Sequence, residues 1–241
     1  MTAASHPTEQ APGNGLSAPE SVQNPVSGTE RRPGGEFGPQ AGAEGREALR
    51  EQYAAAHWDR HFAAGKGFRP VDQAEMRLLT EHVQPRPGQR ALDVGCGLGG
   101  YAAQLAGLGY ETLAVDWAGS SIAAVRDRYT GVVPGLEAMH VDFEDDLAVA
   151  ASVPSGAFSL VTMRLVLAFM ADKPAAAARV RGLLAPGGAW VVTSSLAEDL
   201  PPERAHIGLT RDDVGVLTEG WGRGCWYDLE PRGLRCFVLR A

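Results

Sequence analysis

Short apolar runs alternate with helical segments along the middle of this chain, and this alternation restricts the fold more than any other feature of the sequence. We predict buried strands at five apolar runs, at residues 91–94, 112–115, 137–141, 158–163 and 189–193. A helical segment follows each of the early runs. Strands that alternate with helices pair in parallel, and their connections place helices on both faces of the sheet. The sequence therefore predicts an α/β fold with a doubly wound parallel sheet.

Local signals set the limits of several predicted helices. Apolar residues recur at helical spacing over 101–108, and Gly109 stands where a C-terminal cap is expected. Ser120 and Ser121 are predicted N-caps of a helix over 122–129.

The chain after Leu196 has a different pattern. A loop leads to a predicted helix over 211–219, and two further runs, 226–230 and 234–240, flank the turn residues 231–233. We predict a terminal hairpin there, since an antiparallel edge on a parallel sheet is common.

The N-terminal region divides into two parts. Residues 1–45 hold six prolines among many Gly, Ser and Gln, and cannot bury enough apolar surface to offset their ordering entropy. We predict a disordered tail there, because no periodic pattern favours the alternative, a partner-binding arm. Helices are predicted over 47–61, ended by Gly65 and Gly67, and over 71–83.

Charge and composition exclude several classes of protein. With 22 Lys plus Arg against 29 Asp plus Glu, the formal net charge is −7, which disfavours an electrostatic grip on nucleic acid. No stretch approaches the roughly 18 uncharged apolar residues that span a bilayer, and the N-terminal residues show no basic region followed by an apolar one, so we expect a cytoplasmic protein without membrane contact. Three irregularly spaced cysteines form neither a disulfide framework nor zinc spacing, so we expect no metal.

A glycine loop joins the first predicted strand to the helix after it, and its spacing has two interpretations. Gly95, Gly97 and Gly100 satisfy the G-x-G-x-x-G pattern of dinucleotide sites, with Asp116 where a ribose-binding acid is expected. A nicotinamide-dependent oxidoreductase is therefore one candidate. However, Asp93 stands two residues before the first of these glycines, where a carboxylate repels a pyrophosphate and suits a cationic amino acid group.

Further along the chain, Asp142 and Phe143 follow the third strand, where they suit an exocyclic amine and a flat base. The turn at 184–188 contains Pro-Gly-Gly and leads into the fifth strand. In this order of motifs the chain resembles the class I S-adenosylmethionine-dependent methyltransferases. The resemblance covers about residues 50–241 and implies a Rossmann-like seven-stranded sheet, order 3-2-1-4-5-7-6, with strand 7 antiparallel. It identifies 46–241 as the methyltransferase domain.

The resemblance also implies roles for individual residues toward S-adenosylmethionine. The methionine part is assigned to Asp93, Gly95, Gly97 and Gly99, the ribose hydroxyls to Asp116, and the adenine to Asp142, Phe143 and Trp117. Simpler roles remain open: Phe143 as core only, Cys96 as a small buried filler, and 144–146 as a solvated loop or helix start rather than a metal site.

The acceptor end carries less information. The aromatic segment with Trp58, Phe62 and Phe68 is similar to the opening of thiopurine-type thiol methyltransferases, which also carry an arginine after strand 4, where Arg164 stands here. This similarity implies that 46–84 form a helical lid and that these four residues line the substrate. A weaker similarity joins residues 187–221 to tellurite-resistance methyltransferases.

Catalytic groups are not specified by the sequence. Arg164 and His57 are the candidates, although Arg164 could equally be a surface residue. His57 and His61, four residues apart, could serve as a base or a metal pair, but a plain helix surface is favoured because no third ligand can be named. A dedicated base is not required, because the cofactor already carries the activated carbon. We expect methyl transfer to a small molecule, with a thiol or another soft nucleophile favoured. A non-catalytic member of the fold is the further alternative.

Overall fold

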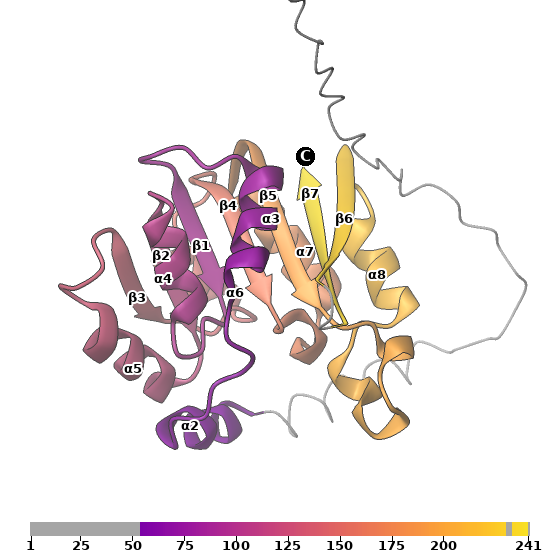
Figure 1. Cartoon of the computed structure of the whole chain (residues 1–241), viewed down its shortest axis with the longest axis horizontal. Coiled ribbons are helices and arrows are strands. Elements are labelled where there is room, and N and C mark those ends of the chain that lie inside the picture. Colours follow the sequence, from indigo (N-terminus) through magenta and orange to yellow (C-terminus); the bar gives the residue numbers. More distant parts are fainter. Residues whose placement is uncertain (1–53, 230–232, 241) are drawn as a thin grey trace, which may run out of the picture.

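A seven-stranded sheet forms the centre of the computed structural model, which describes residues 54–229 and 233–240 (Figure 1). The strands are β1 Arg90–Val94, β2 Glu111–Asp116, β3 Leu136–His140, β4 Phe158–Arg164, β5 Leu184–Ser194, β6 Arg223–Leu229 and β7 Leu234–Arg240. Their order is β3-β2-β1-β4-β5-β7-β6. The first five pair in parallel, and β7 is antiparallel to both β5 and β6. The predicted fold, strand order and terminal hairpin are therefore confirmed.

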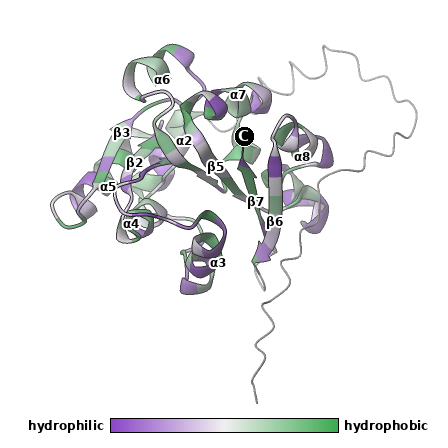
Figure 2. Cartoon of the chain, turned by 90° about the horizontal axis from the view of Figure 1, so that it is seen from above, coloured by the Kyte–Doolittle hydropathy of each residue, from purple (hydrophilic) through white to green (hydrophobic). Residues whose placement is uncertain are grey.

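Helices cover both faces of this sheet. They are α2 Ala55–Ala63, α3 Gln73–Val83, α4 Gly100–Gly107, α5 Gly119–Tyr129, α6 Asp146–Ser152, α7 Lys173–Leu183 and α8 Arg211–Thr218, with short 3-10 turns η1 Leu167–Phe169, η2 Ala197–Asp199 and η3 Pro202–Ile207. Figure 2 shows α3 and α4 on one side of the sheet and α6 and α7 on the other. In Figure 1, α2 lies beyond the ends at which β4 and β5 finish.

The alternation of side chains along β1 explains the two layers. Leu92 and Val94 face the core shared with α6, α7 and α8, whereas Ala91 faces α3 and α4. Both sets are almost fully buried, as expected for a parallel strand covered on both sides. On the α4 side, Asp93 is the next inward position after Ala91, so the strand carries a carboxylate into the interior at its carboxyl end.

Two N-terminal predictions need adjustment. The predicted tail, 1–45, and the first part of the predicted helix 47–61 lie outside the described residues. The described part of that helix, α2, continues to Ala63, before Gly65 with its left-handed φ of 68°. The second helix begins at Gln73 rather than 71, because the Asp72 side chain caps it by accepting from the Glu75 N–H at 2.9 Å.

The predicted N-caps of the helix after β2 are wrong. Ser120 and Ser121 lie inside α5, whose N-cap position, Ala118, makes no side-chain capping bond. The cap comes instead from α2: Asp59 Oδ1 accepts from the Ser120 N–H at 2.8 Å, and the Ser120 hydroxyl donates to the Asp59 carbonyl at 2.8 Å. This exchange fastens α2 to the start of α5.

Candidate active site

A cavity opens at the carboxyl ends of β1 to β4. Its walls come from the loop after β1, the ends of β2 and β3, the segment after β4, and α2 with the linker at 67–71. Ligands of open α/β sheets bind at this end, between two neighbouring strands whose connections leave in opposite directions, as those from β1 to β2 and from β4 to β5 do here. Asp93, Asp116 and Asp142, the acids predicted to bind one ligand, all line this cavity.

The glycine loop folds back against the end of β2. The N–H groups of Gly95 and Cys96 donate to the Val115 carbonyl at 2.8 and 3.1 Å, and the Gly97 N–H donates to Asp116 Oδ2 at 2.9 Å. Gly95 and Gly97 take left-handed φ values of 67° and 52°, which other residues rarely adopt.

The space beside each glycine is already occupied by a neighbouring side chain. A Cβ on Gly95 would lie 2.4 Å from Val166 Cγ2, and one on Gly97 would lie 3.2 Å from Phe62 Cε1. A Cβ on Gly99 would lie 2.7 Å from Val125 Cγ2 on α5. Gly95 and Gly97 line the cavity, but Gly99, which we predicted at the methionine part, is not among the lining residues. Its place is behind the loop, against α5.

Asp93 is a buried carboxylate with one unused oxygen. Its side chain is only 2 % exposed, and its Oδ1 accepts from the Thr162 hydroxyl at 2.8 Å. Among the described residues, no hydrogen-bond donor reaches Oδ2. Burial raises the pKa of Asp93 to about 7, against the lowering effects of the Thr162 hydroxyl and the Arg164 charge. Such a group favours a cationic ligand, which would compensate the charge that burial disfavours.

Asp116 is held by the backbone around it. Its Oδ1 accepts from the Ala118 N–H at 2.9 Å, and its Oδ2 accepts from Gly97 as described above. The side chain is 5 % exposed, and burial raises its pKa although both backbone donors lower it. These contacts fix the carboxylate at the cavity wall, where its remaining lone pairs suit hydroxyl donors.

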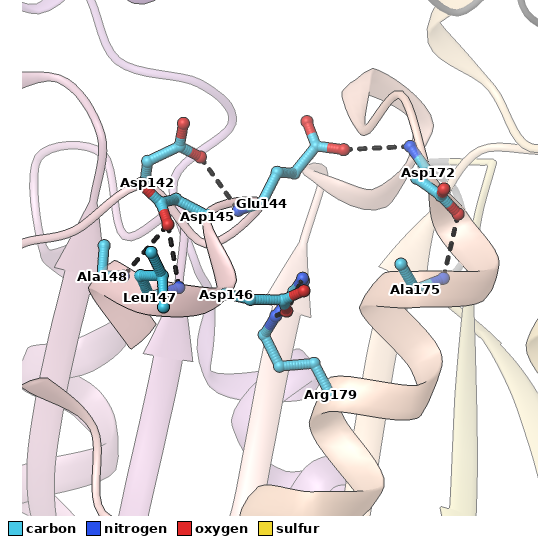
Figure 3. Close-up of polar contacts among 9 residues, drawn as sticks. All are labelled: Asp142, Glu144, Asp145, Asp146, Leu147, Ala148, Asp172, Ala175 and Arg179. Carbon is cyan, nitrogen blue, oxygen red and sulfur yellow. Dashed lines mark hydrogen bonds and ion pairs between the residues drawn. The ribbon is translucent and has the colours of Figure 1, made fainter. Parts of the chain in front are cut away.

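Asp142 and Phe143 form the wall at the end of β3. Asp142 Oδ1 accepts from the Glu144 N–H at 2.9 Å, which orders the turn (Figure 3). Phe143 is 5 % exposed, and the Arg179 guanidinium carbon lies 5.3 Å from its ring centre. Phe143 is part of the main core and also lines the cavity, so its place in the core does not prevent contact with a ligand.

The acidic run after Phe143 stabilises helix ends. Asp145 Oδ1 caps α6 by accepting from the N–H groups of Leu147 and Ala148, and Asp146 pairs with Arg179 (Figure 3). Glu144 Oε1 accepts from the Asp172 N–H at 2.9 Å. The predicted loop and helix start are therefore confirmed. Within the described part of the chain, no group of three His, Cys, Asp or Glu side chains is arranged to hold a metal.

Aromatic side chains close the cavity on the α2 side. Trp58, Phe62 and Phe68 line it, together with Trp117 and Phe169. Trp58 is at the centre of this group, with ring centres 5.9 Å from Phe62, 5.5 Å from Phe68 and 5.2 Å from Phe169. Phe68 is 47 % exposed, so it stands at the rim. The predicted acceptor-lining aromatics thus share one wall.

His57 does not reach the cavity. It is exposed on α2 and is not among the lining residues, because Trp58 and Phe62 occupy the inward face of that helix. His61, one turn later, packs instead on Phe68, with ring centres 5.3 Å apart. The structure therefore gives no support to His57 as a catalytic group.

Arg164 lines the cavity but is buried rather than on the surface, with its side chain 9 % exposed. Its Nε and Nη2 donate to the two carboxylate oxygens of Glu75 at 2.6 and 3.0 Å, and its Nη1 donates to the Arg69 carbonyl at 2.9 Å. We did not identify Glu75 from the sequence. The sequence does contain an indication that Glu75 is buried: it stands four residues before Leu79, on the apolar face of α3.

Comparison with known families identifies the central part of the chain. Residues 92–192 match the family described as "Methyltransferase domain". Nocamycin O-methyltransferase of Saccharothrix syringae is 37% identical over 155 residues, which are 63% of this chain and 51% of that protein. The chain spans about half the length of the curated relatives it matches.

Solved structures share the fold at low identity. N-methyltransferase NodS from Bradyrhizobium japonicum, in complex with S-adenosyl-L-homocysteine, superposes with a TM-score of 0.59 at 18% identity, over 77% of this chain and 97% of that one. The [4+2]-cyclase SpnF superposes with a TM-score of 0.57 at 16% identity, over 80% and 94% of the two chains. These likenesses establish the fold.

Proposed function

We propose that this chain, whose residues 92–192 match the family described as "Methyltransferase domain", is a class I S-adenosylmethionine-dependent methyltransferase that binds S-adenosylmethionine and transfers its methyl group to a small molecule. One observation carries the proposal: carboxylates from the ends of three successive strands line a single cavity beside the glycine loop. A cofactor that carries a sulfonium, an ammonium, ribose hydroxyls and an adenine amine supplies a cation or donor for each of them.

The residues present fit this cofactor. Asp93, with its unused Oδ2, suits the ammonium of the methionine part, and Gly95 and Gly97 bring bare backbone to the same wall. Asp116 suits the ribose hydroxyls. The same reasoning places the adenine amine on Asp142, with the ring near Phe143 and Trp117. A dinucleotide fits less well, because its pyrophosphate would meet the Asp93 carboxylate.

When bound, the cofactor supplies an electrophilic methyl carbon: the acceptor's lone pair forms the new bond while the carbon–sulfur bond breaks and its electron pair stays on sulfur. The chain has to align the acceptor and exclude water. We infer that α2 and residues 64–72 act as the lid that does so, with Trp58, Phe62 and Phe68 covering the acceptor.

The acceptor is a small molecule, because the net charge of −7 disfavours nucleic acid and aromatic side chains form the wall of the cavity on the α2 side. In the described residues, no helix is long and apolar enough to cross a membrane. A thiol or other soft nucleophile is our favoured acceptor, since it ionises without a strong base. The name of the relative above makes hydroxyl acceptors the first competitors to test.

Calorimetry with S-adenosylhomocysteine tests cofactor binding directly. The wild-type chain should bind it, and Asp116→Ala should weaken binding by more than about tenfold, the expected loss for a charge-assisted contact. Asp127→Ala, at an exposed position of α5, removes the same charge and should have no effect. Absence of wild-type binding at about 1 mM would refute the proposal.

Turnover distinguishes methyl transfer from a role in binding alone. Incubation with methyl-labelled cofactor and a panel of thiols, hydroxyls and amines should transfer label to at least one acceptor. Binding without transfer to any acceptor would favour a member of the fold with another activity, for which the [4+2]-cyclase SpnF is a structural precedent.

A further inference from the structure

The cavity holds two buried groups of opposite charge at the ends of β1 and β4. Asp93 and Arg164 both line it, with the residue 2 % exposed in one case and the side chain 9 % exposed in the other. Their strands are paired neighbours, with Asp93 opposite Thr162, two residues before Arg164, and the Arg164 charge lowers the pKa of Asp93. A carboxylate and a guanidinium at the ends of two paired strands suit a ligand group that carries both an ammonium and a carboxylate.

The guanidinium of Arg164 is fixed by Glu75, a residue that does not line the cavity. Glu75 is 2 % exposed and binds Nε and Nη2 with its two oxygens, yet it is not among the lining residues, whereas Arg164 is. The Arg69 carbonyl accepts a hydrogen bond from one N–H of Nη1, and the Tyr101 ring centre lies 5.8 Å from the guanidinium carbon. A guanidinium has five N–H donors, and these contacts use three. Within the described part of the chain, two donors remain for a ligand oxygen.

We propose that Arg164 binds the α-carboxylate of the cofactor while Asp93 binds its α-ammonium, and that Glu75 is the positioning residue that orients Arg164. This inference rests on the proposed function, and it assigns Arg164 to the cofactor rather than to the methyl acceptor. It also gives a reason for the buried ion pair between Glu75 and Arg164 at this place. A carboxylate brought beside Asp93 without a fixed cation would add like charge in a low-dielectric site.

The binding of two nucleosides distinguishes a role of Arg164 toward the cofactor's amino acid group from a role toward the methyl acceptor or in the structure of the cavity. S-Adenosylhomocysteine carries the amino acid group, and 5′-methylthioadenosine carries the same nucleoside and sulfur without it. The wild-type chain should bind the first more tightly. Arg164→Gln alone would remove the guanidinium that pairs with the buried Glu75 carboxylate, so the decisive variant is Glu75→Gln with Arg164→Gln, which removes both charges together.

For this double variant, the affinity for S-adenosylhomocysteine should fall by about tenfold or more, whereas that for 5′-methylthioadenosine should stay within about twofold. Arg164→Lys keeps the charge and should recover part of the loss. Glu75→Gln alone should weaken S-adenosylhomocysteine binding by a smaller factor, with the second nucleoside again unaffected.

Equal losses for both nucleosides would show that the pair acts only on the cavity's structure, and would overturn the inference. Unchanged affinity for both nucleosides would show that Arg164 does not bind the cofactor, would favour a role toward the methyl acceptor, and would also overturn the inference. Failure of the wild-type chain to bind either nucleoside would instead refute the proposed function itself. Thermal unfolding of each ligand-free variant checks that the fold is intact.

Discussion

Replacing Asp93 by Asn should stabilise the ligand-free protein while weakening its grip on the cofactor. A pKa raised from 3.8 to about 7 means that keeping this carboxylate ionised in the folded state costs up to about 4 kcal/mol, at about 1.4 kcal/mol for each factor of ten. The unfolded chain loses the proton from about pH 4, whereas the folded chain keeps it to about pH 7. Folding stability therefore falls as the pH rises through this window.

The asparagine introduced by Asp93→Asn would have no charge to lose. Its amide places a donor without a partner at the Oδ2 position, at a cost of about 1–3 kcal/mol that does not depend on pH. The stability of Asp93→Asn relative to the wild type should thus rise by up to about 4 kcal/mol between pH 4 and pH 7.5. At the higher pH the net effect should be a gain of about 1–3 kcal/mol.

Urea unfolding of the ligand-free protein at several pH values measures this difference. Asp127→Asn is the matched control, because it removes one carboxylate from an exposed position and should show no such trend. The affinity of Asp93→Asn for S-adenosylhomocysteine should be lower than that of the wild type. A stability difference that stays flat from pH 4 to pH 7.5 would refute the reasoning about Asp93.

Two further predictions concern backbone contacts around the cavity. Asp59→Ala removes the cap that α2 gives to α5, worth about 1 kcal/mol, so tryptic cleavage after Lys66 in the linker should accelerate about fivefold; an unchanged rate would show that this contact does not hold α2 in place. Gly95→Ala should cost about 2–4 kcal/mol in thermal or urea unfolding, since its Cβ meets Val166 in addition to the backbone strain. Gly156→Ala, with a similar φ of 61° and no atom within 4 Å, isolates the strain, and an equal loss at both positions would exclude the steric part.

The strands and the glycine loop were predictable because their signals are local. Apolar runs and left-handed glycines depend on neighbouring residues, and the five parallel strands lie within a few residues of the predicted ranges, although β5 begins earlier, at Leu184. Local patterns do not specify the order of strands, which came from the resemblance to a family. The positions of Asp93, Asp116 and Asp142 followed once that order was known.

The contacts that escaped prediction join distant parts of the chain. Glu75 and Arg164 are 89 residues apart, and Asp59 and Ser120 are 61 residues apart. Sequence spacing contains no information about such pairs. Ser120 has the sequence surroundings of an N-cap, but α5 begins at Gly119, one residue before Ser120. The contact with Asp59 replaces a local cap. For Gly99, the motif predicted a place in the glycine loop but not whether the residue faces the cavity or packs against α5.

The exchange of hydrogen bonds between Asp59 and Ser120 constrains protein engineering of this scaffold. Grafting a foreign segment in place of α2, to change which molecules the cavity accepts, would remove the carboxylate oxygen that accepts from the Ser120 N–H. Any such chimera needs an Asp, Asn or Ser at the equivalent site of the graft, or a capping side chain installed in place of Ala118.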